Sequence, residues 1–238
     1  MNLTIAQFTY HALLGRRRML LLLILPALLL AIAVIVRWAA GPDPTVSANL
    51  LQAFALGTIV PLLGLLAGTG AIGTEIDDGS IVYLLAKPLS RMTIVLTKLA
   101  VAVGCLIVCA AAPMLLAGVI LSGSVHNLPI AFAVAALVAG TAYCVGFLLL
   151  AVVTRHAVVI GLVYALVWES LVGNYIPGAR ALSIQQWALS IADSMTSSAD
   201  VHSAVRLAVA IVLLAVVIVG GTWLAGRRLR SFTLSHAD

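Results

Sequence analysis

Few side chains in this sequence are of types that carry chemistry in proteins, and two of them are cysteines four residues apart. Cys105 and Cys109 fall on one face of a helix inside a long apolar run, and Cys144 falls inside another. Two thiols at this spacing fit either a metal or redox pair or two small packing residues that suit an apolar environment. The sequence favours packing, and the three cysteines give no disulfide framework.

A carboxylate also stands inside an apolar stretch. Glu169 follows Val167 and Trp168 near the end of an apolar run. An ionisable group at depth in a membrane is a functional hypothesis by default, so Glu169 is the candidate residue for a transport pathway. The alternative is a carboxylate that already lies at the outer interface and contacts water or Arg180.

The polar segment 73–91 separates two long apolar runs and contains the short apolar piece 81–86. Six residues are too few to span a bilayer. Ser80 can cap a short helix at this point and Pro88 would end it. Such an amphipathic helix either docks into a groove on a soluble partner or faces lipid in an ordinary loop. The apolar contacts with a partner would come from Ile81, Leu84 and Leu85.

The motifs of common enzymes do not occur in the sequence. It contains no G-x-x-x-x-G-K-[ST] loop, no G-x-S-x-G and no H-E-x-x-H, and its five histidines are scattered among the termini and loops. We therefore expect no catalytic residue, no metal ligand and no enzyme activity in this chain by itself. The apolar runs hold few ionisable groups, so the energy for any transport is expected to come from another protein.

The composition predicts that lipid is the natural solvent. Apolar residues make up 63% of the chain and charged residues only 9%, against roughly a quarter charged in soluble domains. The basic residues form short clusters beside apolar runs, which does not favour nucleic-acid binding. We predict an all-α integral membrane protein that forms a single transmembrane domain over residues 1–238. Its six spans are expected at 19–38, 50–72, 94–121, 129–153, 157–172 and 204–225.

Two further helical regions are expected outside the spans. Residues 2–14 show polar and apolar positions at helical spacing, which favours a helix in the membrane interface over a disordered N-terminus. Residues 173–203 form the longest stretch between spans, and we expect one or two short helices at the outer interface there. Within the second span, Gly64 and Gly68 form a G-x-x-x-G pair that permits close helix approach.

The distribution of basic residues predicts the orientation. Arg37, Arg180 and Arg206 fall on one side of a six-span chain, and the other ten Lys and Arg fall on the opposite side. The positive-inside rule places the larger group in the cytoplasm, together with both termini. Trp38, Trp168, Tyr175 and Trp187 would then form an aromatic belt at the outer interface.

The 73–91 segment resembles the E-x-x-x-G-[ST]-x-x-x-L-L-x-x-P-x-[ST]-R loop of ABC transporter type-2 exporter permeases. The six-span plan, with its interfacial N-terminal helix and basic tail, is similar to that family along nearly the whole chain. Asp77 and Asp78 differ from the family, in which basic residues are common at these positions. The matching residues are Glu75, Gly79, Ser80, Leu84, Leu85, Pro88, Ser90 and Arg91.

The resemblance implies an ATP-driven exporter in the plasma membrane of a prokaryote. Two permease chains, as a homodimer or a paralogous heterodimer, would form the pathway above two copies of a separate ATPase. The ATPase would bind ATP and Mg, and this chain would hold no cofactor. The resemblance implies that the ATPase contacts the coupling residues Glu75, Gly79, Ser80, Ile81, Leu84, Leu85, Pro88 and Arg91.

Two other functions remain open at this stage. A non-enzymatic membrane sensor, or an assembly, maturation or immunity factor, would use the same loop to dock a soluble partner. A membrane-embedded enzyme is the third, and the sequence shows no catalytic constellation for it. Copurification of an ATPase subunit separates the exporter from both.

Overall fold

The computed structural model describes residues 16–77, 90–123, 127–172, 180–196, 201 and 203–231, and its elements are all helical. The segments labelled η are π-helical, except for η4, which is a short 3₁₀ turn. In chain order the elements are α2 (Arg16–Ala40), α3 (Pro44–Asn49), η1 (Leu50–Ile59), α4 (Val60–Asp77), α6 (Arg91–Leu106), η2 (Ile107–Ala111), α7 (Ala112–Ser122), α8 (Leu128–Val153), α9 (Ala157–Val163), η3 (Tyr164–Val172), η4 (Arg180–Leu182), α11 (Ile184–Met195), α12 (Leu207–Ala215), η5 (Val216–Gly220) and α13 (Gly221–Ser231).

Five helical runs are long and apolar enough to cross a membrane, so the described chain has the architecture of an all-α, multi-pass membrane protein. A sixth apolar helix is shorter, and the predicted fifth span therefore stays a prediction. The N-terminal helix expected at 2–14 lies outside the described residues. The five runs are Met19–Ala40, Pro44–Gly73, Arg91–Ser122, Leu128–Val153 and Leu207–Leu229, and the shorter helix is Ala157–Glu169.

The spans differ from the predicted boundaries by a few residues at their ends. The second begins at Pro44 instead of residue 50, because Asp43 caps the helix there: its Oδ1 accepts hydrogen bonds from the Thr45 and Val46 amides. The last span lies at Leu207–Leu229 instead of 204–225, because residues 203–206 form a hydrogen-bonded turn.

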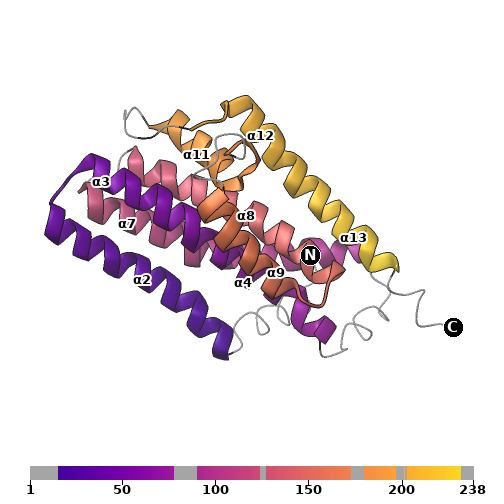
Figure 1. Cartoon of the computed structure of the whole chain (residues 1–238). Coiled ribbons are helices and arrows are strands. Elements are labelled where there is room, and N and C mark those ends of the chain that lie inside the picture. The colour runs from indigo at the N-terminus through magenta and orange to yellow at the C-terminus, as the bar shows by residue number, and fades with distance from the viewer. Residues whose placement is uncertain are drawn as a thin grey trace.

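The centre of the bundle is formed by α8 and by the second span, η1–α4. In each of these spans 61% of the most apolar window is buried, against 22% in α2 and 17% in the last span. Figure 1 shows α2 on one side of this centre and α12–α13 on the other. The side chains on α2 and α12–α13 therefore give the bundle a largely apolar outer surface, as lipid requires.

The closest packing in the bundle joins α4 to α8. A Cβ atom on Gly64 would lie 2.6 Å from the Cβ of Tyr143, and one on Gly68 would lie 2.5 Å from the Cys144 carbonyl oxygen. Only hydrogen side chains leave room for the helices at this distance. The predicted close approach through the G-x-x-x-G pair is confirmed.

A side chain from the first span completes the end of the third. The Arg37 guanidinium donates from Nη1 to the Leu121 carbonyl at 2.9 Å. The last carbonyls of a helix lack partners within the helix, and a cation is favourable there. Gly123 ends the helix in the left-handed region at φ 71°, so Arg37 and Gly123 together cap α7.

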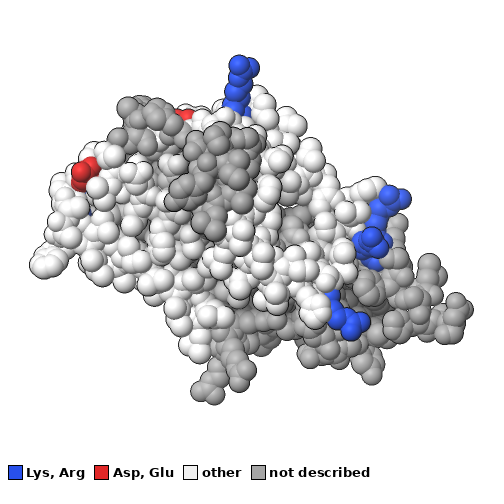
Figure 2. All heavy atoms as spheres, viewed as in Figure 1, with Lys and Arg blue, Asp and Glu red and all other residues white. Residues whose placement is uncertain are grey.

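The two ends of the bundle differ in character. One end, here called the basic end, is where α8 and α13 finish and α6 begins, and it carries the exposed Arg155, Arg227 and Arg228. The other, the α11 end, holds α3, α11 and the beginning of α12. In Figure 2 the blue and red atoms lie toward the rims of the body, and the described surface between them is white.

Candidate functional site

The described ends of the predicted coupling segment lie at the basic end, in α4 and α6. Glu75 belongs to the last turns of α4, and Arg91 is the first residue of α6. The remaining predicted coupling residues lie outside the described part of the chain. These are Gly79, Ser80, Ile81, Leu84, Leu85 and Pro88.

Ser90 gives a physical reason for the hydroxyl residue in the loop pattern. Its backbone is extended, and its Oγ accepts a hydrogen bond from the Thr93 amide at 3.2 Å, so Ser90 is the N-cap of α6. Its hydroxyl also contacts the Thr93 hydroxyl at 2.6 Å. The end of the loop and the beginning of the third span are thus fixed at a defined residue.

Lys98 joins the two spans on either side of the loop. It lies two turns into α6, its exposed fraction is 0%, and its Nζ donates to the Ala71 carbonyl of α4 at 2.7 Å. The sequence reasoning missed this residue by counting it among the basic residues of the inner side. The signal was its position among Ile94, Val95 and Leu99, which share a buried helix face with it.

Glu169 is completely buried near the α11 end, with an exposed fraction of 0%. Its Oε1 accepts hydrogen bonds from the Tyr164 hydroxyl at 3.0 Å and from the Ile184 amide at 3.1 Å. Its Oε2 accepts a hydrogen bond of 2.5 Å from the Ser183 hydroxyl. The alternative of a carboxylate in contact with water does not hold, because Ser183 and Ile184 at the start of α11 cover it, while its contact with Arg180 stays a prediction.

Two local features create this arrangement. Tyr164 and Glu169 are five residues apart, and the π-helical turn of η3 brings positions at that spacing to the same side. Ser183 is the N-cap of α11, and Ile184 is its first residue. Glu169 therefore supplies a negative group to a helix N-terminus, where free amides and the helix dipole both favour an anion.

The α11 helix is buried far more deeply than a helix that rests on a surface. Every residue from Ile184 to Ser190 is buried, and α11 packs against α8 and α12. The Gln185 amide donates to the Gln52 carbonyl of η1 at 2.8 Å. The predicted interfacial position of α11 stays a prediction. Trp187 is only 6% exposed, so its indole packs against protein, and its place in an aromatic belt at the outer interface stays a prediction.

Two buried polar atoms at the α11 end have no hydrogen-bond partner within normal geometry. They are the hydroxyl of Tyr143 in α8 and the Oε1 of Gln185. Tyr143 lies close enough to Glu169 and Tyr164 to interact with both electrostatically. The α11 end therefore contains a polar cluster inside an apolar bundle, drawn from α8, η3 and α11, and no motif in the sequence pointed to Tyr143 or Gln185 as part of it.

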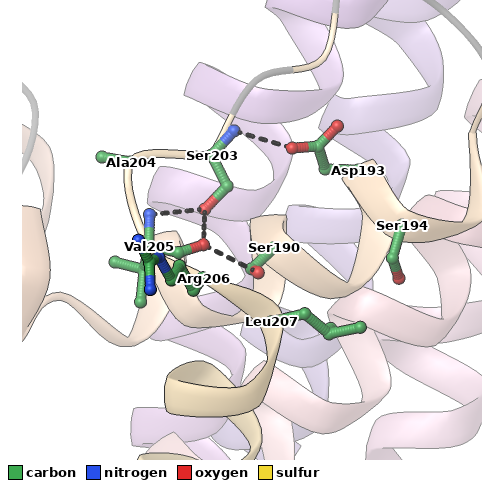
Figure 3. A pocket seen from close by; sticks show the side chains of 8 residues that line it. All are labelled: Ser190, Asp193, Ser194, Ser203, Ala204, Val205, Arg206 and Leu207. Carbon is green, nitrogen blue, oxygen red and sulfur yellow. Dashed lines mark hydrogen bonds between the residues drawn. The ribbon is translucent and has the colours of Figure 1, made fainter.

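A pocket of about 390 Å³ opens between α11 and the start of α12. Figure 3 shows that its wall is a turn held by hydrogen bonds: Asp193 accepts from the Ser203 amide at 3.1 Å, and Ser190 donates to the Val205 carbonyl at 3.0 Å. These bonds fix the connection from α11 to the last span. The exposed Arg206 also lines the pocket.

The sites predicted from the sequence lie at opposite ends of the molecule. The helix ends that flank the loop belong to the basic end and Glu169 belongs to the α11 end, so these residues do not form one chemical site. No model of a protein family matches the chain, and no curated protein matches it. The fold and these two ends define a helical multi-pass membrane protein with a buried polar cluster at one end.

Proposed function

We propose that this chain is the membrane-spanning permease subunit of an ATP-driven (ABC) exporter, which forms the substrate pathway as a dimer and couples to separate ATPase subunits. The observation that carries the proposal is the loop pattern from Glu75 to Arg91, at the junction of the second and third spans. Its resemblance to the coupling loop of type-2 exporter permeases extends over eight positions of matching residue type and spacing.

The surroundings of the loop suit the transmission of a force. Its first residues belong to α4 and its last to α6, so a displacement of the loop acts on both helices. The buried hydrogen bond from Lys98 to the Ala71 carbonyl joins the two helices about two helical turns away from the loop. Since α4 also packs tightly on α8 through Gly64 and Gly68, the motion would reach the centre of the bundle.

The proposed orientation places the basic end in the cytoplasm and gives the chain six spans. The experiment uses single cysteines in a chain whose three native cysteines are replaced by serine. Thr45→Cys and Met195→Cys should react with an impermeant maleimide from outside the cell, while Asp78→Cys and Phe232→Cys should react only after permeabilisation. Labelling of position 78 in intact cells would overturn the orientation.

The function is tested by removing the two leucines of the loop. Leu84→Asp together with Leu85→Asp removes two apolar anchors, and burial of each Leu is worth roughly 1.5–3 kcal/mol. At about 1.4 kcal/mol per tenfold, docking should weaken at least about a hundredfold. Added carboxylates deepen the loss, because they must be desolvated on binding. The measurement is the ATPase activity that copurifies with the tagged chain from its native membranes.

The control variant is Val82→Glu, which changes another face of the same short piece and should retain the ATPase. The double variant should still insert and pair with a second permease chain, because its spans are unchanged. Retention of the ATPase at the wild-type level by the double variant would remove the main support for the proposal. Capture of a soluble protein without ATPase activity would favour the sensor or assembly factor instead.

A further inference from the structure

The thiols of Cys105 and Cys109 lie together in the middle of the third span. Their sulfur atoms are 4.0 Å apart, and Cys105 donates a hydrogen bond to Cys109. Both side chains are half-buried, at the edge of an exposed helix face. They are almost equally distant along the chain from the two ends of the Arg91–Ser122 run, which places them near the midplane of a bilayer.

The helix changes its geometry between the two cysteines. Cys105 lies in the last turn of α6, and Cys109 lies in the π-helical segment η2, which begins at Ile107. Short π-helical segments inside α-helices occur frequently at functional sites. The third cysteine, Cys144, is completely buried in the neighbouring α8 and is near enough to act electrostatically on Cys105.

We propose that Cys105 and Cys109 form a binding site for a soft, thiophilic monovalent cation of the Cu(I) class. Thiolate sulfur is the ligand that such ions select over oxygen or amine groups. At the zinc–thiolate bond length of about 2.3 Å, sulfurs 4.0 Å apart would subtend an angle of about 120° at a metal. Two-coordinate Cu(I) prefers a nearly linear arrangement, which a rotation of the two side chains about their Cα–Cβ bonds would have to provide. The sulfurs can therefore bind one ion without a rearrangement of the helix.

Binding has a simple balance of charge. Each thiol releases one proton and donates one electron pair to the cation, so the ion and the two thiolates carry one net negative charge. No electron is transferred. An intrahelical disulfide would instead need an oxidant and would have to bring the sulfurs from 4.0 Å to about 2.05 Å.

The choice of a monovalent ion follows from the number of ligands. In the described residues no group of three or more His, Cys, Asp and Glu side chains is placed to hold a metal. Structural zinc takes four such ligands, and calcium takes six or more oxygens. Soft monovalent ions are stable with fewer ligands, and two thiolates suit them.

The test is an anaerobic titration of the full-length, reduced protein in detergent with Cu(I), in competition with a chromogenic Cu(I) chelator. The wild-type chain should bind one Cu(I) and show thiolate-to-copper absorption in the near ultraviolet. Cys105→Ser and Cys109→Ser should each lose more than about a hundredfold in affinity, since loss of an outer-shell partner alone costs about 10–100-fold. Size-exclusion elution at the wild-type volume verifies that each variant is folded.

Cys144→Ser is the matched control, because it removes the third thiol and leaves the pair intact. Wild-type binding by this variant, together with the two losses, supports the site. The proposal is overturned if the wild-type chain does not bind Cu(I), if either serine variant of the pair binds like wild type, or if Cys144→Ser loses the ion. Preferential binding of Zn²⁺ would overturn the assignment to a monovalent ion.

Discussion

Among the charged residues whose side chains the structure describes, Glu169 and Lys98 are the two that are fully buried, and they are anchored in different ways. The carboxylate of Glu169 accepts three hydrogen bonds, from a hydroxyl on its own helix and from two groups at the start of α11. The ammonium of Lys98 reaches the Ala71 carbonyl of another span, 27 residues earlier in the chain. Glu169 holds a helix end in place, whereas Lys98 holds two spans together.

This difference indicates what each end of the molecule can do. Three donors surround Glu169 on adjacent segments, so the α11 end is a locally closed unit that resists displacement. The bond of Lys98 joins two long helices whose connecting loop is the proposed docking site. A change at the α11 end should therefore stay local, while one at the basic end should alter how two spans move together.

The largest effect is expected when Glu169 is replaced by alanine. Glu169→Ala leaves two buried donors, at Ser183 and Ile184, without an acceptor, each at a cost of about 1–3 kcal/mol, and the partly buried Tyr164 hydroxyl loses its acceptor as well. The chain should unfold at a clearly lower temperature in detergent, and α11 should loosen. The measurement is the rate of maleimide labelling of Ser190→Cys in a chain without native cysteines. Position 190 is only 4% exposed, so its labelling should be slow with Glu169 present and faster in Glu169→Ala.

Met195→Cys is the control for this experiment, because position 195 is already 43% exposed and its labelling should not change. Glu169→Gln keeps one acceptor oxygen and should be less destabilising. If Glu169 lines the pathway, Glu169→Gln should change transport in an assembled complex. Unchanged labelling of position 190 in Glu169→Ala would show that the carboxylate does not hold α11.

A smaller effect is expected for Lys98→Met, which keeps the length of the side chain and removes its charge and its donor. Loss of the Nζ bond to the Ala71 carbonyl should cost about 1–3 kcal/mol, measured by thermal unfolding in detergent. The methionine side chain carries no charge, so the variant avoids the cost of burying the Lys98 ammonium, and the loss in stability should lie near the lower end of about 1–3 kcal/mol. The control is Leu96→Met, on the exposed side of the same helix, which should have no effect. If Lys98→Met and Leu96→Met are equally stable, the Lys98 bond does not hold the two spans together.

The smallest effect is expected for Gly57→Ala at the α11 end. The new Cβ would lie 2.8 Å from the Nε2 of Gln185, so this flexible side chain must shift and its bond to Gln52 weakens, at about 0.5–1.5 kcal/mol. The gain of about 0.5–1 kcal/mol from Gly to Ala in a helix largely offsets this cost. The control is Gly146→Ala, whose new Cβ meets no neighbour within 4 Å and which should stabilise the chain. An equal gain in stability from Gly57→Ala would contradict the contact between Gly57 and Gln185.

Apolar runs and glycine spacing were sufficient to predict most of the fold. Five predicted spans correspond to long apolar helices, and the packing of Gly64 and Gly68 on α8 is confirmed. The burial of α11 was not predictable, because its amphipathic pattern fits a surface helix equally well. What decides the difference is the set of contacts with α8 and Glu169, which are far from α11 in sequence and invisible to a periodicity argument.

The two buried ionisable side chains were also only partly predictable from the sequence. The sequence identified Glu169 because a carboxylate is conspicuous in an apolar run, but its partners Tyr164 and Ser183 depend on the π-helical turn of η3 and on the cap of α11. Lys98 escaped notice because it follows the basic residues of a loop. Only the helix register from Ser90 onward shows that it points to α4.

The cap that Arg37 places on α7 has a consequence for the synthesis of the chain. The guanidinium and its partner, the Leu121 carbonyl, are 84 residues apart. At roughly 5–20 residues per second, the ribosome needs about 4–17 s to make that interval. During this time α2 is already made while its polar contact does not yet exist. Arg37 must therefore stay hydrated at the bilayer surface until then, and although α2 can already pack on η1 and α4, its docking is complete only after the third span has been inserted.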